Sequence, residues 1–323
     1  MKKKYRAAII GAGNIGAFYS PPQNYKGIIT HAHAYQKEKR TQLVAFLDIN
    51  KKKAQKAAKV WGVKSYTDPQ KMFKTEKIDL VSICTPDKTH QQSLKICLKY
   101  RPKAVFCEKP FTTDLKAGEE LVKTYNQLKI PLAVNYNRRW NQAISELRDR
   151  IRKNEFGVNL NNVVIYNKGI LHNGSHWIDL LRYFFGEISE AIPLSAKIDW
   201  RKTDPTLDAF LKFKKGVKVH LVATNWHHYE VGELDLLFEK ARIRLVKAGA
   251  FLEYFKIIES PLLREEKVLG AAQIKKTQLT STLLRAPAII IDSLENKKRL
   301  PCSGADALTT QKICQKLIQL WKN

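Results

Sequence analysis

The feature that most constrains this chain is a glycine motif near its N-terminus, Gly11-Ala12-Gly13-Asn14-Ile15-Gly16. It directly follows Ala7–Ile10, an apolar run typical of a buried strand, and we expect it to open a helix. Gly11 would permit the tight turn, Gly13 would let the backbone approach a pyrophosphate, and Gly16 would allow close helix packing. The motif predicts a dinucleotide-binding turn, because free N–H groups at a helix start attract phosphates. A glycine-rich turn without a ligand is the alternative.

Short apolar runs alternate with helical patterns through the first 134 residues. Strands separated by helices of ten or more residues need crossover connections, so this part predicts a parallel, doubly wound α/β sheet. The expected strands are 7–10, 43–47, 80–84, 104–107 and 132–134, and the expected helices are 51–61, 91–100 and 115–128.

The pattern changes after about residue 135. Successive strand-like runs with short turns, including a hairpin signal at Lys214-Lys215-Gly216, predict an α+β domain with a largely antiparallel open sheet. We therefore expect a dinucleotide-binding domain over 1–134 and a second domain over 135–323. In the second domain the expected helices are 143–152, 176–185 and 305–321, and the expected strands are 163–166, 191–198, 207–213, 217–223, 234–238, 243–246 and 251–258.

The chain of 323 residues carries a formal charge of +27, which raises the question of nucleic-acid binding. The lysines are scattered, however, and no block of five or six like charges occurs. We therefore expect a lysine-rich surface and no nucleic-acid partner. A field that attracts anionic substrates is the sharper interpretation of the same charge.

Cysteine spacing and hydropathy indicate the compartment. The five cysteines lie far apart without a metal-binding spacing, which suggests a reducing environment. No run of about 18 apolar residues occurs, so no membrane span is predicted. We expect a cytoplasmic protein with no membrane partner.

Asp48 follows the second predicted strand. A carboxylate there binds the ribose diol and repels a 2′-phosphate, which favours NAD over NADP. Asp48 lies 32 residues beyond Gly16, further than the usual ~20. An insertion near Tyr19–Thr30 accounts for the excess. Lys51–Lys53 could accommodate a 2′-phosphate, so NADP remains an alternative cofactor. The alternative role for Asp48 is that of an acidic residue at the N-terminus of the next helix.

Two further turns follow predicted strands. Thr85-Pro86 follows the third strand and Glu108-Lys109-Pro110 follows the fourth. Ligands of parallel sheets bind outside the carboxyl ends of the strands, so both turns are expected to face the cofactor. A lysine there can hold a hydroxyl and stabilise alkoxide charge. In so lysine-rich a chain, an exposed surface lysine is a strong alternative for Lys109.

The segment from His172 to Leu181 carries two histidines and an acid. His176 is expected to open a helix, with Asp179 one turn on, and can take a hydroxyl proton near neutral pH. His172 and His176 also have metal-ligand spacing, but we expect Gly174 to break the helix between them and see no third ligand. No metal site is predicted, and a core histidine is the alternative for His176.

Together these clusters resemble the Gfo/Idh/MocA family, which includes glucose–fructose oxidoreductase and inositol dehydrogenases. The resemblance covers nearly the whole chain, and Glu-Lys-Pro after a strand is its most specific element. The matching pieces are Gly11–Gly16, Asp48, Thr85-Pro86 with His90, Glu108-Lys109-Pro110, Asn135–Arg139, Gly174–Asp179 and Ser303–Leu308.

The resemblance implies an N-terminal Rossmann domain and a C-terminal sheet that forms a homo-oligomer, a dimer or tetramer, with the last helix packing back near the first domain. It implies that Lys109 contacts the nicotinamide ribose and the substrate hydroxyl, and that His176 is the acid/base, with His172 as a third catalytic candidate. The expected cofactor-binding residues are Gly11, Gly13, Asn14, Ile15, Gly16, Asp48, Thr85, Pro86, His90, Glu108 and Lys109. The expected substrate-binding residues are Lys109, Arg138, Arg139, His172, Asn173, His176 and Asp179.

The function implied is an NAD(P)-dependent oxidoreductase that acts on a ring carbinol of a sugar, cyclitol or sugar derivative, phosphorylated or nucleotide-linked forms included. Two departures stand out. His172 occupies a position where the family often has Asp, and the insertion at Tyr19–Thr30 could form a lid or substrate wall. The alternatives are a non-catalytic dinucleotide- or sugar-binding regulator, an imine or enone reductase, and a nucleic-acid-binding protein.

Overall fold

The computed structural model describes residues 4–23 and 27–322, and the chain divides into two compact units. The first runs to Trp140 and also includes Thr280–Thr309, and the second consists of Asn141–Leu279 and the residues from Thr310 onward. Each unit has its own cluster of buried apolar side chains. The first unit thus takes 280–309 from the range expected for the second domain.

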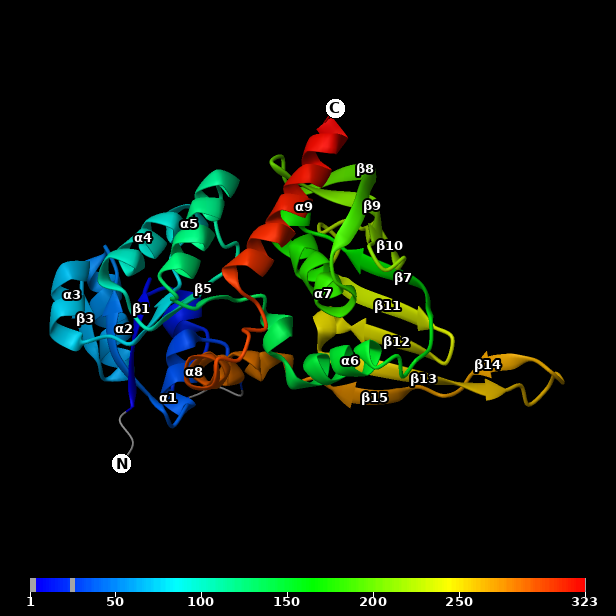
Figure 1. Ribbon diagram of the computed structural model, residues 1–323, viewed down its shortest axis with the longest axis horizontal. Helices are drawn as coiled ribbons and strands as arrows, with labels where there is room; N and C mark the ends of the chain where they lie inside the picture. The colour runs from blue at the N-terminus through cyan, green and yellow to red at the C-terminus, as the bar shows by residue number, and fades with distance from the viewer. Residues whose placement is uncertain (1–3, 24–26, 323) are drawn as a thin grey trace. The chain divides into compact units, whose positions relative to one another are not determined.

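A six-stranded, fully parallel sheet forms the centre of the first unit, which confirms the doubly wound fold (Figure 1). Its order is β3-β2-β1-β4-β5-β6. In the two middle strands, the residues from Ala7 to Ile10 and from Leu80 to Ile83 are buried, and all but Ser82 are apolar, because helices cover both faces of a parallel sheet. The strands are β1 (Tyr5–Ile10), β2 (Thr41–Leu47), β3 (Lys64–Tyr66), β4 (Leu80–Ile83), β5 (Ala104–Cys107) and β6 (Leu132–Val134).

Helices α4 and α5 lie on one side of this sheet and α1 and α8 on the other (Figure 1). The sequence patterns missed α1, α3, β3 and α8. The first three are short, and α8 belongs to a late segment that returns to this unit. The helices of the first unit are α1 (His31–Lys37), α2 (Lys51–Trp61), α3 (Pro69–Glu76), α4 (His90–Tyr100), α5 (Leu115–Gln127) and α8 (Ala286–Asn296).

The glycine motif opens only a short helical turn, η1 (Asn14–Phe18), which has π-helical hydrogen bonding. The expectation of a regular helix at this point is wrong. The chain instead enters the predicted insertion, whose base is closed by the Ser20 side chain: its oxygen accepts hydrogen bonds from the N–H groups of Ile29 (3.1 Å) and Thr30 (3.0 Å). Thr30 then caps α1, so the first regular helix begins at His31.

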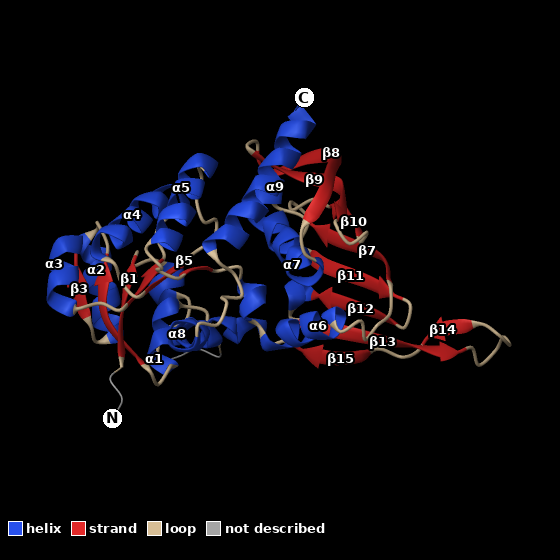
Figure 2. Ribbon diagram, viewed as in Figure 1, coloured by secondary structure: helices blue, strands red, loops and turns tan. Residues whose placement is uncertain are grey.

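A nine-stranded, mostly antiparallel sheet forms the second unit, as predicted, with one parallel pair between β7 and β10 (Figure 2). The expected hairpin at 214–216 joins β9 and β10, and Gly216 has φ +84°. The strand order is β14-β13-β12-β11-β7-β10-β9-β8, with β15 paired to β13. The strands are β7 (Asn159–Tyr166), β8 (Ile188–Arg201), β9 (Asp204–Phe213), β10 (Lys218–Ala223), β11 (Gly232–Phe238), β12 (Ala241–Val246), β13 (Phe251–Glu259), β14 (Lys267–Leu269) and β15 (Gln273–Lys276).

The helices of this unit bury apolar side chains in the second core. They are α6 (Gln142–Arg152), α7 (Ser175–Phe185) and the later part of α9 (Gly304–Lys322), which begins in the first unit. Nearly every residue of α7 is buried, consistent with its place in the middle of the core. Among the described helices, none has an apolar stretch long enough to cross a bilayer.

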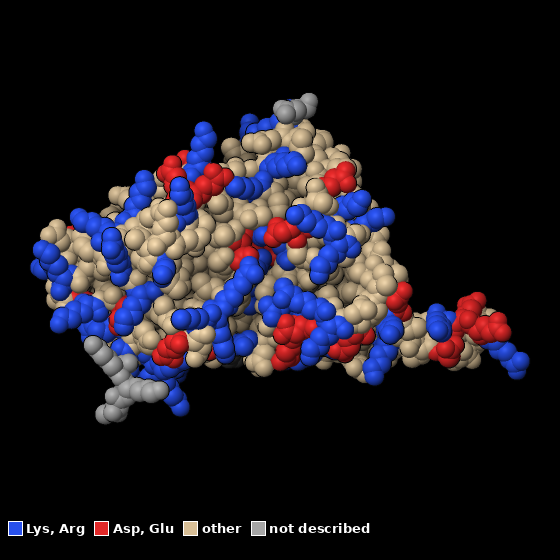
Figure 3. Space-filling model, viewed as in Figure 1, with Lys and Arg blue, Asp and Glu red and all other residues tan. Residues whose placement is uncertain are grey.

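The positive charge is distributed over the surface. Figure 3 shows Lys and Arg side chains spread across both units in the view, with Asp and Glu between them.

All five cysteines are free thiols with buried side chains. Burial raises the pKa of the thiols, those of Cys97 and Cys314 among them.

Candidate active site

The glycine turn of the first unit is shaped for close approach. Gly11 has φ +100°, and a Cβ there would lie 2.5 Å from the carbonyl carbon of Cys84 and 2.6 Å from the nitrogen of Thr85. A Cβ on Gly16 would lie 2.5 Å from the Gly11 oxygen. At Gly13, by contrast, a Cβ would meet no described atom within 4 Å. The turn is therefore packed against the end of β4 on one side and open on the other.

Asp48 is joined to the glycine turn. Its Oδ2 accepts a hydrogen bond from the N–H of Ala12 (2.9 Å), and its Oδ1 accepts one from the N–H of Asn50 (2.8 Å). Asn50, not Asp48, caps α2. Asp48 therefore lies half-buried beside the turn, where a carboxylate can also meet a ribose. Nearby, Asn14 is exposed and Ile15 packs against the core.

His90 joins the turns after β4 and β5. Its side chain is fully buried, with Nδ1 2.7 Å from the Pro110 oxygen and Nε2 2.9 Å from the Thr85 oxygen. Both ring nitrogens thus contact protein carbonyls. His90 holds Thr85-Pro86 and the Glu108-Lys109-Pro110 turn together at the carboxyl edge of the sheet.

Glu108 is the centre of a buried polar network that the sequence patterns missed. Its Oε1 accepts hydrogen bonds from His31 Nε2 (2.8 Å) and Asn135 Nδ2 (2.6 Å), and its Oε2 accepts one from the Lys109 N–H (3.3 Å). Burial alone would raise the pKa of Glu108, but the hydrogen bonds from His31 and Asn135 and the nearby Lys109 charge bring it below its ordinary value. An anionic Glu108 therefore directly precedes Lys109.

The network continues away from Lys109. His31 Nδ1 lies 2.8 Å from the Ser82 hydroxyl, which lies 2.8 Å from the hydroxyl of Tyr35. His31 and Tyr35 belong to α1, the helix that follows the insertion. The two histidines of this short helix, His31 and His33, are the feature of the sequence that could have indicated the network. Their burial, however, depends on how α1 packs against β4.

Two amide oxygens at the same edge of the sheet are buried with no hydrogen-bond partner among the described residues, those of Asn135 and Asn137. Such atoms are costly unless a ligand or water satisfies them. Together with the open side of Gly13, they fit a dinucleotide whose hydroxyl and amide groups can donate hydrogen bonds. The residues of the first unit therefore suit an NAD-type cofactor.

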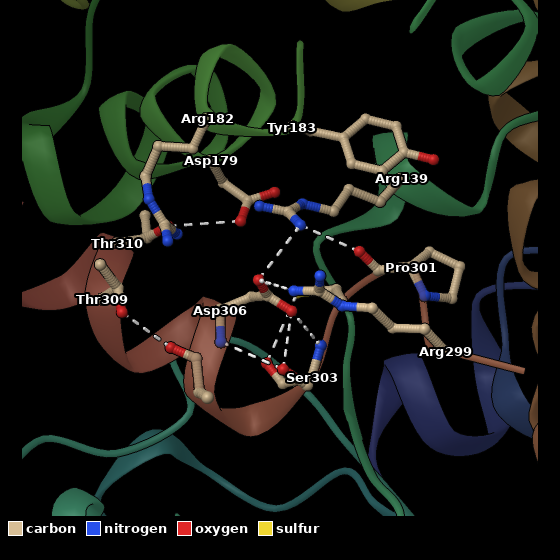
Figure 4. A network of polar contacts seen from close by, with 12 residues as sticks. Arg139, Asp179, Arg182, Tyr183, Arg299, Pro301, Ser303, Asp306, Thr309 and Thr310 are labelled. Atoms are coloured by element: carbon tan, nitrogen blue, oxygen red, sulfur yellow. Dashed lines mark hydrogen bonds and ion pairs between the residues drawn. The ribbon is translucent and has the colours of Figure 1, made fainter. Parts of the chain in front are cut away.

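Arg138 and Arg139 lie buried in the turn after β6, η3 (Asn137–Trp140). Arg139 Nη1 donates to the Pro301 oxygen (2.9 Å) and lies 3.8 Å from Asp306 Oδ1 (Figure 4). Burial raises the pKa of Asp306, but Arg139 and a hydrogen bond from Ser303 bring it below its usual range. Within the first unit, Arg139 thus fixes the start of α9.

In the second unit, the predicted histidines lie in one continuous helical segment. His172 and Asn173 belong to a π-helical turn, η4 (Gly169–Gly174), which runs directly into α7 with His176 in its first turn. Gly174 has φ −58° and ψ −36°, which are helical angles. The expectation that it breaks the helix is wrong, and the helix accepts a glycine here because a side chain has no room: a Cβ would lie 2.7 Å from Ile170 Cδ1.

Asp179 lies one turn after His176 and is buried. Its Oδ1 accepts a hydrogen bond from the Thr310 hydroxyl (3.3 Å), which also accepts one from Arg182 Nη1 (2.9 Å) (Figure 4). Asp179 therefore ties α7 to α9 inside the second unit. Among the described residues, no cluster of three or more His, Cys, Asp or Glu side chains could hold a metal ion.

Known proteins resemble this chain along most of its length. A family model described as "Oxidoreductase family, NAD-binding Rossmann fold" matches residues 5–136, and one described as "GFO/IDH/MocA C-terminal domain" matches residues 162–244. Inositol 2-dehydrogenase 1 of Mycolicibacterium vanbaalenii is 30% identical over 215 residues, 60% of this chain and 62% of that protein. D-apiose dehydrogenase of Paraburkholderia graminis is 23% identical over 215 residues, 61% of this chain and 54% of that protein.

A solved structure with a similar fold is the WlbA dehydrogenase of Bordetella pertussis in complex with NADH and UDP-GlcNAcA. It has a TM-score of 0.80 at 17% identity and covers 99% of this chain and 96% of its own. The matched regions cover between 29% and 62% of the length of these curated relatives, whereas the fold matches throughout. With models of both halves matched, the chain belongs to the Gfo/Idh/MocA oxidoreductase family and contains an NAD-binding Rossmann domain.

Proposed function

We propose that this protein is an NAD(P)-dependent oxidoreductase that transfers a hydride between the nicotinamide and a ring carbinol of a sugar, cyclitol or sugar derivative. The observation that carries the proposal is the buried network around Glu108. It holds the backbone of Lys109 at the carboxyl edge of a parallel sheet, the edge where such sheets bind ligands.

Lys109 is assigned to the reacting oxygen. Its ammonium donates a hydrogen bond to the substrate hydroxyl and stabilises the negative charge that grows there as the C–H bond breaks. The anionic Glu108 beside it keeps the local charge balanced. Because the Lys109 N–H is bonded to the Glu108 carboxylate, the side chain leaves a fixed point on the backbone.

His176 is assigned to the proton. In the direction of oxidation its imidazole takes the hydroxyl proton, and in the reverse direction it returns one. The bound nicotinamide supplies the hydride acceptor or donor.

The cofactor is assigned to residues 1–134 and the substrate to residues 135–323. Asp48 favours NAD, because its carboxylate repels a 2′-phosphate, while Lys51–Lys53 on the following helix leave NADP use to be measured. Arg138 and Asn173 remain assigned to the substrate. The contacts of Arg139 and Asp179 give both residues a structural task as well.

The test is a panel of sugars and cyclitols with NAD and NADP, followed by the absorbance of the reduced cofactor. Lys109→Ala should lower kcat/KM by roughly 10²–10³-fold, since it removes the charge that stabilises the alkoxide. His176→Ala should lower it by roughly 10²–10⁴-fold and remove a pH-dependent limb from the rate profile. Lys59→Ala, an exposed lysine on α2, is the matched control and should have no effect. Full turnover in both site variants contradicts the proposal.

The same experiment distinguishes three alternatives, of which His172 in place of the family Asp favours the non-catalytic regulator. Activity that survives His176→Ala but requires Lys109 favours reduction of an imine or enone, which needs no carbinol base. Tight NAD binding without turnover of any substrate favours a regulator on the same scaffold. A steep loss of affinity for nucleic acid with added salt, without NAD binding, favours charge-driven nucleic-acid binding.

A further inference from the structure

Two tryptophans in the second unit hold two cations beside the segment that carries His172. The Lys168 ammonium lies 3.6 Å from the centre of the Trp226 ring and 4.9 Å from that of Trp200, and the Arg201 guanidinium lies 5.1 Å from the centre of the Trp200 ring. The His172 ring lies 5.5 Å from Trp200, centre to centre. The two indoles meet edge to face. We call these five residues the tryptophan cluster.

The cations of this cluster lie against aromatic rings. Within the described chain, neither Lys168 nor Arg201 has a carboxylate within ion-pair distance; aromatic faces hold them instead. The buried carboxylate of Asp199 accepts hydrogen bonds from the N–H groups of Lys168 and Trp226 (3.0 Å each) and from the Thr206 hydroxyl. It therefore fixes the backbone of the cluster.

The backbone at Lys168 is strained. Lys168 has φ +66° and ψ +44°, the left-handed region that Gly and Asn occupy more easily. The next residue, Gly169, is also left-handed, at φ +81°, and donates to the Thr206 hydroxyl (2.7 Å). A lysine at such a position gives up stability, which is a common feature of functional sites.

The cluster lies in the part of the second unit that carries the proposed base. Lys168 directly precedes η4, which contains His172 and continues into the first turn of α7 with His176. A ligand group held by Lys168 is therefore bound next to the helical segment that carries the proposed proton acceptor. Asp204 holds this segment, since it accepts the N–H groups of Leu171 (2.7 Å) and His172 (3.0 Å).

We propose that the substrate is a sugar or cyclitol that carries a phosphate group, and that Lys168 and Arg201 of the tryptophan cluster bind this group. A phosphate brings close to two negative charges and three acceptor oxygens, which matches an ammonium and a guanidinium held in place. Inositol itself is uncharged, so this substrate class differs from the one that the names of the inositol dehydrogenase relatives indicate. The inference rests on the proposed function.

The test measures binding to the full chain by calorimetry without cofactor, with glucose, glucose 6-phosphate and UDP-glucose as probes. The wild-type protein should bind at least one phosphorylated probe roughly tenfold or more tightly than glucose. The two phosphorylated probes distinguish a monoester from a nucleotide-linked phosphate. Lys168→Asn and Arg201→Gln should each remove roughly tenfold of that affinity.

Lys202→Asn is the matched control, because it removes the same charge from an exposed residue next to Arg201 that contacts neither indole. Asn tolerates the left-handed backbone, so Lys168→Asn should retain the wild-type melting temperature. With a turned-over phosphorylated substrate, Lys168→Asn should raise KM and leave kcat within about twofold.

Equal affinity for glucose and both phosphorylated probes overturns the inference, as does equal weakening by Lys202→Asn and Lys168→Asn. Failure of the proposed function has a different signature. In that case phosphorylated probes bind through Lys168 and Arg201, but no substrate of the panel reduces the cofactor.

Discussion

Gly11 and Gly13 of the glycine turn differ in whether the fold itself requires a glycine. Gly11 has a positive φ, and a Cβ added there would lie 2.5–2.6 Å from backbone atoms of Cys84 and Thr85, which leaves no room for a side chain. Gly13 has φ −90° and open space where a side chain would lie. The first glycine is thus needed by the fold, whereas nothing in the protein itself requires the second.

This contrast yields a prediction. Gly13→Ala should retain the wild-type melting temperature but weaken NAD binding by roughly tenfold or more, because the added methyl group occupies the space of the pyrophosphate. Gly11→Ala should lower the free energy of unfolding by at least about 2 kcal/mol, through steric clash and backbone strain. Calorimetric NAD titrations and thermal unfolding of both variants measure the two effects. Unchanged NAD affinity in folded Gly13→Ala would show that the cofactor does not cross this turn.

At the scale of elements, the Glu108 network joins one helix to three strands. His31 comes from α1, Ser82 from β4, Glu108 from the end of β5 and Asn135 from the end of β6. These strands are adjacent in the sheet, so the network fixes the edge where Lys109 lies. His31 is the first residue of α1, the helix that directly follows the insertion at Tyr19–Thr30.

Removal of His31 should therefore disturb both stability and the site. His31→Ala leaves the buried Glu108 carboxylate and the Ser82 hydroxyl short of a partner, and we expect a loss of about 3 kcal/mol in the free energy of unfolding. Tyr35→Phe removes a neutral end of the same network and should cost about 1 kcal/mol. Chemical denaturation measures both losses. Equal losses in the two variants would contradict a charge-centred network.

The pH dependence of stability has a defined sign. The folded-state pKa of Glu108 lies below its ordinary value of 4.5, so the carboxylate stabilises the fold above that pH. This contribution is lost as the pH falls from about 4.5 through the folded-state pKa. The stability difference between wild type and Glu108→Gln should therefore be constant near neutral pH and shrink below about 4.5. A difference that grows on acidification would contradict an anionic Glu108.

At the scale of the whole molecule, the two units differ in what they leave exposed. The parallel sheet of the first is buried, but β8 of the second exposes Ile192, Leu194 and Ile198, with Leu194 and Ile198 each 58% exposed. Contiguous apolar surface on an open sheet marks an interaction face. A homo-oligomer formed through this sheet remains our prediction.

Leu194→Glu tests that prediction. The wild-type chain should sediment as a dimer or tetramer, and the variant should shift towards the monomer, because a buried, unpaired carboxylate opposes association. Its secondary structure by circular dichroism should be unchanged, since Leu194 lies on the surface of the unit. Thr203→Glu, an exposed position in the turn after β8, is the control of equal charge. A wild-type monomer, or an oligomer untouched by Leu194→Glu, would contradict the prediction.

Local sequence patterns predicted the elements whose formation depends mainly on residues close by in the chain. The central strands of both sheets, the hairpin at 214–216 and the turns at Asp48 and Lys109 follow from hydrophobic runs and turn residues, which act within a few positions. They failed at the helix expected after Gly16 and at Gly174, where packing overrides the tendency of the residue. They also missed β3 and α3, which are too short to show a period.

The sequence alone determined the fold class, the family and the order of the turns that we expect to face the cofactor, because a glycine motif, an alternating pattern and a Glu-Lys-Pro turn need no distant partner to be recognised. Only the tertiary structure decided that His31 binds Glu108 and that two indoles hold Lys168. Those contacts join residues 77 and 58 positions apart, and the free energy of bringing them together comes from the packing of whole elements.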